Sequence, residues 1–220
     1  MIEHVLPGDI EKRSFEIIAS ELKDMGIEPE PEQDPVIRRA IHTSADFDYA
    51  KTLVFSDNAV CIARKLIAEG ADIVTDTNMA LTGINKKRLA EHGGHVKCYM
   101  AEEAVALEAG SRGVTRAAVS MEHAASDIKA SGRRTIFAVG NAPTALITLR
   151  TMYDEGVFTP DFIIGVPVGF VNVVEAKELI LETDIPYIIN RGRKGGSNVA
   201  AAIVNALLYG MKCYSAKNCQ

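Results

Sequence analysis

The segment RRAIHTSAD, residues 38–46, holds two adjacent arginines and one of only five histidines in the chain. On a helix, Arg38 and Arg39 precede His42 by four and three positions, so the three side chains project together. Cations disfavour the charged form of a neighbouring imidazole, so an anion bound beside them would make His42 a readier proton donor. The same pattern is typical of a solvated basic face with Asp46 as an ion-pair partner. Spacing alone leaves both interpretations open.

A helix predicted over residues 34–45 sets the direction of those side chains. Asp34 as a cap and Pro35 in the first turn form a strong start signal. At about 100° per residue, the apolar positions gather on one side of this helix, which should face the core. These positions are Val36, Ile37, Ala40 and Ile41. The two arginines and the histidine fall on the opposite side.

A second predicted helix, over residues 10–25, carries an apolar stripe that is interrupted by Ser14. The stripe consists of Ile10, Ile17, Ile18, Leu22 and Met25. A serine inside such a stripe either returns its hydroxyl to a backbone carbonyl of its own helix or faces a pocket. No G-x-S-x-G elbow surrounds it, so the sequence does not predict an acyl-enzyme serine.

The most specific local signal is RGRKGG, residues 191–196, in which Arg191, Arg193 and Lys194 lie among glycines. The helix expected to follow, with Ser197 as its N-cap, would present its first N–H groups to an anion. The spacing matches neither a Walker A loop nor a G-x-G-x-x-G dinucleotide turn. The stretch therefore favours a carboxylate or phosphate site over a merely flexible basic loop.

From about residue 71 onward, short apolar runs alternate with helical segments. The runs lie at 72–76, 95–100, 134–140, 162–169 and 186–190. This alternation predicts an α/β fold with a largely parallel sheet and helices on both faces. We expect a single domain over residues 1–220, with the N-terminal helices contributing to the site.

In such sheets the ligand binds outside the carboxyl ends of the strands, where the strand order reverses. Three glycine-rich loops follow predicted strands and suggest a broad site. These loops lie at 138–144, 164–172 and 189–198. Asn141 is predicted to cap the helix after the first loop. Asp76 either lines the site or caps its own following helix, and Arg116 either reaches this crevice or lies on the surface.

Composition excludes several classes of partner. The chain has 220 residues and a formal net charge of −5, which argues against a general nucleic-acid-binding surface. None of the four cysteines forms a C-x-x-C pair, and His92 and His95 lack a third ligand nearby, so no metal site is expected. The polar start and the lack of a run of roughly 18 apolar residues predict no membrane partner and a cytoplasmic location with reduced thiols.

Taken in chain order, these stretches resemble the precorrin-8X / cobalt-precorrin-8 methylmutase family of cobalamin biosynthesis. The matching segments are RSFEII, IRRAIHTSAD, VTDTNMALTGI, TRAA, VGNAPTAL, IGVPVGFVNVVEAKE and NRGRKGGSNVAAAIVNAL. They cover nearly the full chain. The most specific of them are GNAPTAL, GVPVGFV and RGRKGGS.

The resemblance implies an isomerase that moves a methyl group from C-11 to C-12 on ring C of a corrinoid, with no cofactor. The product would be hydrogenobyrinate, or cobyrinate where cobalt is already present. The resemblance also implies a homodimer whose active site lies near the subunit interface. The family's catalytic histidine falls on His42, and its substrate-contacting serine and arginines fall on Ser14, Arg39 and Arg116.

We also expect Asn141 and the loop cations Arg191, Arg193 and Lys194 to bind the substrate, because guanidinium groups orient planar carboxylates. A non-catalytic corrinoid carrier would show the same loops and cations but would not need His42. A nucleotide- or sugar-phosphate-dependent transferase would need a phosphate fingerprint, and a cobalt chelatase would need a cluster of metal-binding histidines. We therefore prefer the mutase.

Overall fold

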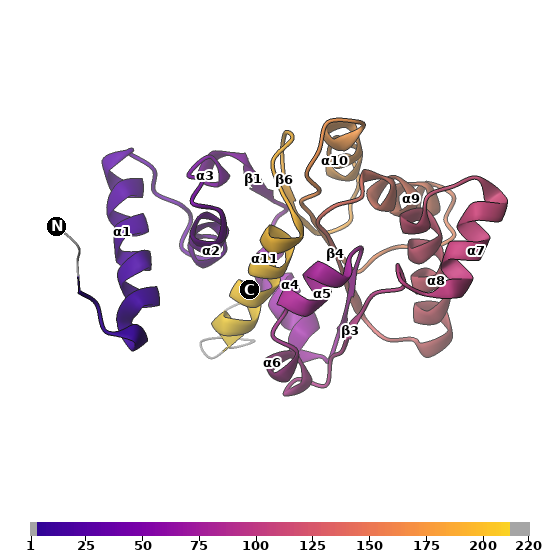
Figure 1. Ribbon diagram of the computed structural model, residues 1–220, viewed down its shortest axis with the longest axis horizontal. Coiled ribbons are helices and arrows are strands. Elements are labelled where there is room, and N and C mark those ends of the chain that lie inside the picture. Colours follow the sequence, from indigo (N-terminus) through magenta and orange to yellow (C-terminus); the bar gives the residue numbers. More distant parts are fainter. Residues whose placement is uncertain (1–3, 212–220) are drawn as a thin grey trace.

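The computed structural model describes residues 4–211, and the strands in that range form one six-stranded sheet (Figure 1). Its order is β1-β6-β5-β4-β2-β3. The strands are β1 (Leu53–Phe55), β2 (Asp72–Thr75), β3 (Val96–Lys97), β4 (Thr135–Val139), β5 (Phe162–Gly165) and β6 (Tyr187–Asn190). Neighbours pair in parallel except β1, which runs antiparallel to β6. The predicted α/β class is confirmed. Strand β1 was not predicted, because its three residues are too few to give a recognisable apolar run.

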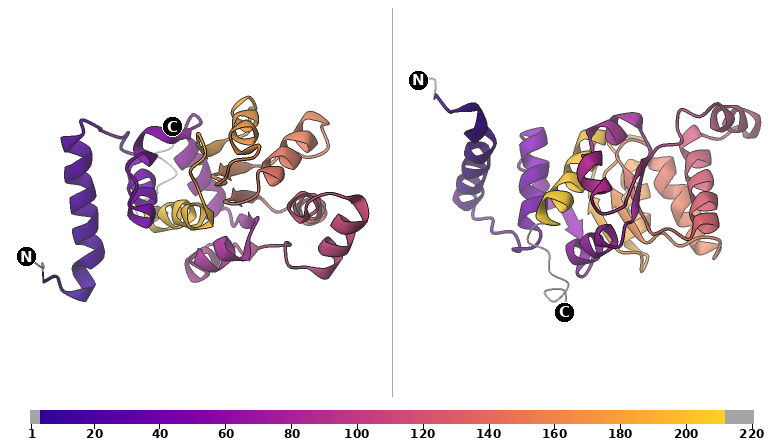
Figure 2. Two further views of the ribbon diagram at one scale, coloured as in Figure 1. Left: turned by 45° about the horizontal axis from the view of Figure 1, so that its top comes forward. Right: turned by 90° about the horizontal axis from the view of Figure 1, so that it is seen from below.

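Helices cover both faces of the sheet, as the alternation predicts (Figure 2). The helices of the described range are η1 (Pro7–Asp9), α1 (Ile10–Asp24), α2 (Asp34–Ser44), α3 (Tyr49–Thr52), α4 (Ala59–Ala68), α5 (Asn78–Gly83), α6 (Lys86–Ala90), α7 (Glu103–Arg112), α8 (Arg116–Ser131), α9 (Pro143–Asp154), α10 (Val173–Leu181) and α11 (Ser197–Gly210). Along β4, Ile136 and Ala138 belong to the core shared with α2, α4 and α11. Phe137 and Val139 belong to the core shared with α8, α9 and α10.

The strand order reverses between β2 and β4, and a buried carboxylate joins their carboxyl ends. Asp76 accepts hydrogen bonds from the backbone N–H groups of Gly140, Asn141 and Ala142, at 2.9, 2.7 and 2.7 Å. Burial raises the pKa of Asp76, and these donors oppose that rise. The carboxylate therefore holds the loop after β4. It does not cap the helix that follows it, because Thr77 is the cap of α5.

The predicted caps of three other helices are wrong in detail. Asp34 is the first residue of α2, and its carboxylate accepts a hydrogen bond from Arg38 Nε at 2.7 Å instead of capping the helix. Ala142, not Asn141, stands at the N-cap position of α9. A glycine, not Ser197, stands at that of α11. In each case the polar side chain lies one position away from the place where it would reach the first N–H groups.

Helix α1 is the outermost element and packs on α2, apart from the sheet (Figures 1 and 2). Two residues of α1, Ile18 and Leu22, are buried against its neighbours. Ile10, Ile17 and Met25 are exposed, at 53%, 39% and 46%. Only part of the stripe therefore packs against α2, and the rest of its apolar surface is left uncovered.

The state of the cysteines also differs from the expectation. Cys61 is part of a disulfide, which corrects the prediction of reduced thiols, whereas Cys98 carries a free thiol. Among residues 4–211, no helix is long and apolar enough to cross a membrane. Over the same range, no group of three or more histidine, cysteine or acidic side chains is arranged to hold a metal ion.

Candidate active site

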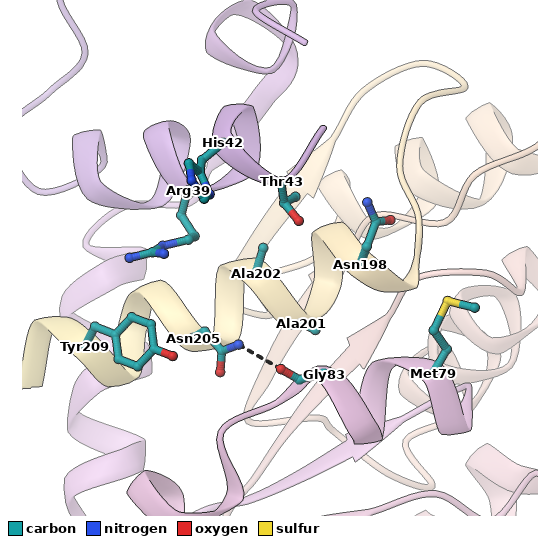
Figure 3. Close-up of a pocket in the computed structure, with 10 residues that line it drawn as sticks. All are labelled: Arg39, His42, Thr43, Met79, Gly83, Asn198, Ala201, Ala202, Asn205 and Tyr209. Atoms are coloured by element: carbon teal, nitrogen blue, oxygen red, sulfur yellow. Dashed lines mark hydrogen bonds between the residues drawn. The ribbon is translucent and has the colours of Figure 1, made fainter. Parts of the chain in front are cut away.

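A groove of about 320 Å³ lies between α2, α5 and α11 (Figure 3). Its lining consists of Arg39, His42, Thr43, Met79, Gly83, Asn198, Ala201, Ala202, Asn205 and Tyr209. Helix α2 supplies a guanidinium and an imidazole, and α11 supplies two amides, a phenol and two alanines. The groove therefore places ionisable groups opposite a wall of small and polar side chains.

Helix α11 forms this wall because its groove face repeats small or polar residues at intervals of three or four. Asn205 fixes the wall to α5: its amide donates to the carbonyl of Gly83 at 2.9 Å and accepts from the N–H of Asn85 at 2.8 Å. A Cβ atom on Gly83 would lie 2.9 Å from the Cβ of Ala201, so only glycine permits this close packing. This wall of the groove is therefore packed closely against α5.

His42 lies on the exposed side of α2, and α1 supports its imidazole from behind. The ring of Phe15 stacks on the imidazole, with centroids 5.1 Å apart and planes 11° from parallel. Within the described part of the chain, His42 makes no hydrogen bond or ion pair that would occupy its ring nitrogens. The imidazole is thus oriented by stacking and keeps its hydrogen-bonding atoms available to a ligand.

Arg39 lies one turn before His42 and is held between two aromatic rings. Its guanidinium carbon lies 4.6 Å from the ring centre of Phe15 and 5.1 Å from that of Tyr209. Its Nη2 atom forms an ion pair with Glu11 of α1 at 2.8 Å. The Arg39 side chain is 18% exposed, whereas that of Glu11 is 60% exposed. The rings therefore fix the cation, while its carboxylate partner is open to exchange with solvent or a ligand.

The cations of the loop 191–196 are arranged differently. Lys194 Nζ donates to Asp46 and Asp48, at 2.6 Å each, and this ammonium holds the pKa of Asp46 below its usual value. Arg191 Nε lies 3.4 Å from a carboxylate oxygen of Glu178. Two of the three predicted anion-binding cations are thus paired within the chain.

Arg193, the third loop cation, covers an exposed ring. Its guanidinium carbon lies 5.3 Å from the ring centre of Phe170, which is 82% exposed in the loop after β5. This contact joins the loops after β5 and β6 at their tips. Arg193 is itself exposed, so the guanidinium edge remains open to solvent.

The structure brings some predicted site residues together and keeps others apart. Arg39 and His42 share the groove, whereas Arg38 pairs with Asp34 and lines a separate hollow beneath α1. Ser14 donates to the carbonyl of Ile10 at 2.9 Å and is not part of the groove lining. Of the two arrangements predicted for Ser14, the structure shows the one in which the hydroxyl bonds to a backbone carbonyl of its own helix.

Arg116 and Asn141 lie at the carboxyl edge of the sheet, outside the groove lining. The hydroxyls of Thr115 and Thr144 are 2.8 Å apart, which joins the start of α8 to the start of α9. Arg116 begins α8, and Asn141 precedes α9. Both side chains are exposed. They are close to the same end of the sheet as the glycine-rich loops.

Sequence reasoning missed Phe15, Tyr209 and the amides of α11. The amides and the phenol are polar side chains at helical spacing on an otherwise apolar helix, so their pattern was available in the sequence. Phe15 carried no such signal, because its role depends on how α1 packs against α2.

Comparison with known proteins supplies the family. A family model described as precorrin-8X methylmutase matches residues 9–210. The chain belongs to this family. The match runs from the start of α1 to the end of α11 and so includes both walls of the groove. Family membership makes the chain an enzyme of the isomerase class, an intramolecular methyl transferase.

Individual relatives match over most of their length. The chain is 41% identical to a cobalt-precorrin-8 methylmutase of Priestia megaterium, over 92% of this chain and 88% of the relative. It is 39% identical to a precorrin-8X methylmutase of Pseudomonas aeruginosa, over 94% and 98%. A crystal structure of a precorrin-8x methyl mutase from Thermus thermophilus superposes with a TM-score of 0.81 at 35% identity, covering 93% of this chain and 98% of that one.

Proposed function

We propose that the chain moves a methyl group from C-11 to C-12 of ring C in precorrin-8X or cobalt-precorrin-8, with His42 as the proton donor. The observation that carries this proposal is the pairing of His42 and Arg39 in one groove, both backed by Phe15. An imidazole with unoccupied nitrogens beside a fixed guanidinium suits a substrate that has both a conjugated ring to polarise and carboxylates to bind.

The chemistry needs no nucleophile from the protein. The bond from the methyl carbon to C-11 breaks as the bond to C-12 forms, in a suprafacial [1,5] shift, so the substrate is neither oxidised nor reduced. A proton held by His42 at the ring system next to the migrating methyl draws electron density toward it and favours the shift. General acid assistance of this kind typically contributes about 10²–10⁴ in rate.

The other predicted site residues bind the substrate in this proposal, chiefly through its carboxylate groups. In this proposal Arg39 binds one carboxylate after exchanging its partner Glu11, which is largely exposed. Other edges of the macrocycle are contacted by the remaining predicted residues, which are Ser14, Arg116, Asn141, Arg191 and Arg193. Lys194 contributes mainly by holding its loop, because its ammonium already has two carboxylate partners. A groove of about 320 Å³ is at the lower end of ligand pockets, so most of a corrinoid would extend beyond it.

Because most of a corrinoid would extend beyond the groove, the proposal includes a homodimer in which a second copy of the chain covers the open side of the site. Helix α1 exposes Ile10 and Ile17 at 53% and 39%, and the loop after β5 exposes Phe170 and Val171 at 82% and 76%. We infer that these exposed apolar residues contribute to the contact between the two copies. The proposal also includes a single domain over residues 1–220 and a cytoplasmic location.

Turnover by the purified protein tests the function. Precorrin-8X and cobalt-precorrin-8 are supplied separately, and the visible spectrum is followed, because the methyl shift extends conjugation in the product. We expect a catalytic spectral change with at least one of them. A non-catalytic carrier would instead bind in a fixed ratio without converting the pigment, and that result would overturn the proposal.

A further inference from the structure

Lys177 is a buried ammonium that the proposed chemistry does not use. It lies in the middle of α10 with 0% of its surface exposed. Burial lowers the pKa of Lys177 to about 8. Removing a charge from water without an opposite charge is costly, so such groups persist where their hydrogen bonds fix a specific arrangement.

The hydrogen bonds of Lys177 go to the glycine-rich loop 191–196. Its Nζ atom donates to the carbonyl of Gly192 at 2.7 Å and to that of Lys194 at 2.9 Å. The side-chain amide of Asn190 donates to the same Lys194 carbonyl at 2.8 Å. Two side chains from different elements thus converge on one carbonyl in the middle of the loop.

The neighbouring loop after β5 is held against this loop by backbone contacts. The N–H of Gly196 donates to the carbonyl of Val166 at 2.9 Å, and that of Gly169 donates to the carbonyl of Arg193 at 3.2 Å. A Cβ atom on Gly195 would lie 2.0 Å from the Val166 carbonyl oxygen, so glycine is required for this approach. Because α10 begins directly after the loop that follows β5, Lys177 ties that helix to the loop after β6 as well.

The arrangement continues to the helix that carries His42. Lys177 binds the backbone carbonyl of Lys194. The side-chain ammonium of Lys194 in turn binds Asp46 and Asp48, just beyond the end of α2. A shift of the loop backbone would therefore weaken or break the ion pairs of Lys194 with Asp46 and Asp48. Glu178, next to Lys177 on α10, pairs with Arg191 and holds the start of the same loop.

We propose that Lys177 is a positioning residue for substrate binding, which holds the backbone of loop 191–196 so that its cations face the substrate carboxylates. It does not touch the substrate. Its removal loosens the loop and weakens binding, while the chemical step at His42 continues. The link to the substrate rests on the proposed function, whereas the ordering of the loop does not.

Lys177→Met tests this inference, because methionine fills a similar apolar space without donating hydrogen bonds. Amide hydrogen exchange of the ligand-free protein is expected to rise in the segment 191–196 and to stay unchanged in β4. With substrate, KM is expected to rise about tenfold, and kcat should stay within about twofold. Lys129→Met makes the same exchange of residue on an exposed face of α8 and should alter neither quantity.

Lys177→Gln, which keeps a side-chain donor, should fall between the wild type and Lys177→Met, and it provides the measurement if the methionine variant does not fold. Wild-type exchange in 191–196 together with an unchanged KM would overturn the inference while leaving the methylmutase activity intact. If the wild-type protein converts no corrinoid, the proposed function fails, and the exchange measurement still decides whether Lys177 orders the loop. A fall in kcat with unchanged KM would also contradict a positioning role in binding.

Discussion

The groove between α2 and α11 and the loop 191–196 both present cations, but the two regions hold them in different ways. In the groove, aromatic rings fix Arg39, and its one carboxylate partner is mostly exposed. In the loop, Lys194 binds two carboxylates and Arg191 one. Stacking leaves hydrogen-bond donors for a ligand, whereas ion pairing consumes them. In the proposed function the groove therefore binds a substrate carboxylate through Arg39. Of the loop cations, Arg193 is the one that stacks on a ring and keeps its guanidinium edge open to the substrate.

Replacing the groove cation should have the largest effect of the changes that probe this comparison. Arg39→Met is expected to raise KM by about 10- to 100-fold, because hydrogen bonds between charged groups contribute roughly 1.5–3 kcal/mol. Steady-state kinetics with a corrinoid substrate measures the change. Arg38→Met, on the same helix but paired with Asp34, should change KM by less than about twofold. Equal effects of the two substitutions would remove the distinction between the two faces of α2.

Replacing the loop lysine should have a smaller effect. Lys194→Met is expected to raise KM by about two- to fivefold, because an exposed ion pair holds the loop and contributes little by itself. It should also lower the temperature of thermal unfolding slightly at pH 7. A loss of affinity as large as that of Arg39→Met would mean that Lys194 binds the substrate directly.

The same pair predicts how stability depends on pH. Lys194 lowers the pKa of Asp46 in the folded protein below the ordinary value of 3.8, so the pair stabilises the fold above that pH. This stabilisation is lost as the pH falls through the lowered pKa. The unfolding temperatures of wild type and Lys194→Met should therefore differ at pH 7 and converge at strongly acidic pH. A difference that persists in acid would rule out the ion pair as its source.

The smallest effect is expected from the exposed partner of Arg39. Glu11→Gln should lower KM by up to about threefold, because it removes a carboxylate that competes with the substrate for the guanidinium. Glu16→Gln, on the same helix and 3.6 Å from Arg13, serves as the matched control and should leave KM unchanged. An increase in KM for Glu11→Gln would mean that Glu11 supports the binding geometry instead of competing for it.

The features that depend on local periodicity could be predicted from the sequence. Spacing that repeats every three or four residues predicts helices α1 and α2 and the shared direction of Arg39 and His42. Short apolar runs predict five of the six strands of the described sheet.

The features that depend on long-range contact could not be predicted. Phe15 stacks on His42 only because α1 folds back on α2, and the partners of Lys194 lie 148 and 146 residues away in the chain. Asp76 was expected to line the site or cap its own helix, but it binds N–H groups 64 to 66 residues further on. The packing of one element against another decides such partners, and no local pattern encodes it.

In the proposed function His42 assists the chemical step, and the rest of the groove binds the substrate. His42→Ala tests it most directly when corrinoid binding and single-turnover conversion are measured on the same preparation. We expect Kd to change by less than about threefold, while the rate of conversion falls by about 10²–10⁴. Conversion at close to the wild-type rate, with the corrinoid bound, would contradict the assignment of His42 as the proton donor.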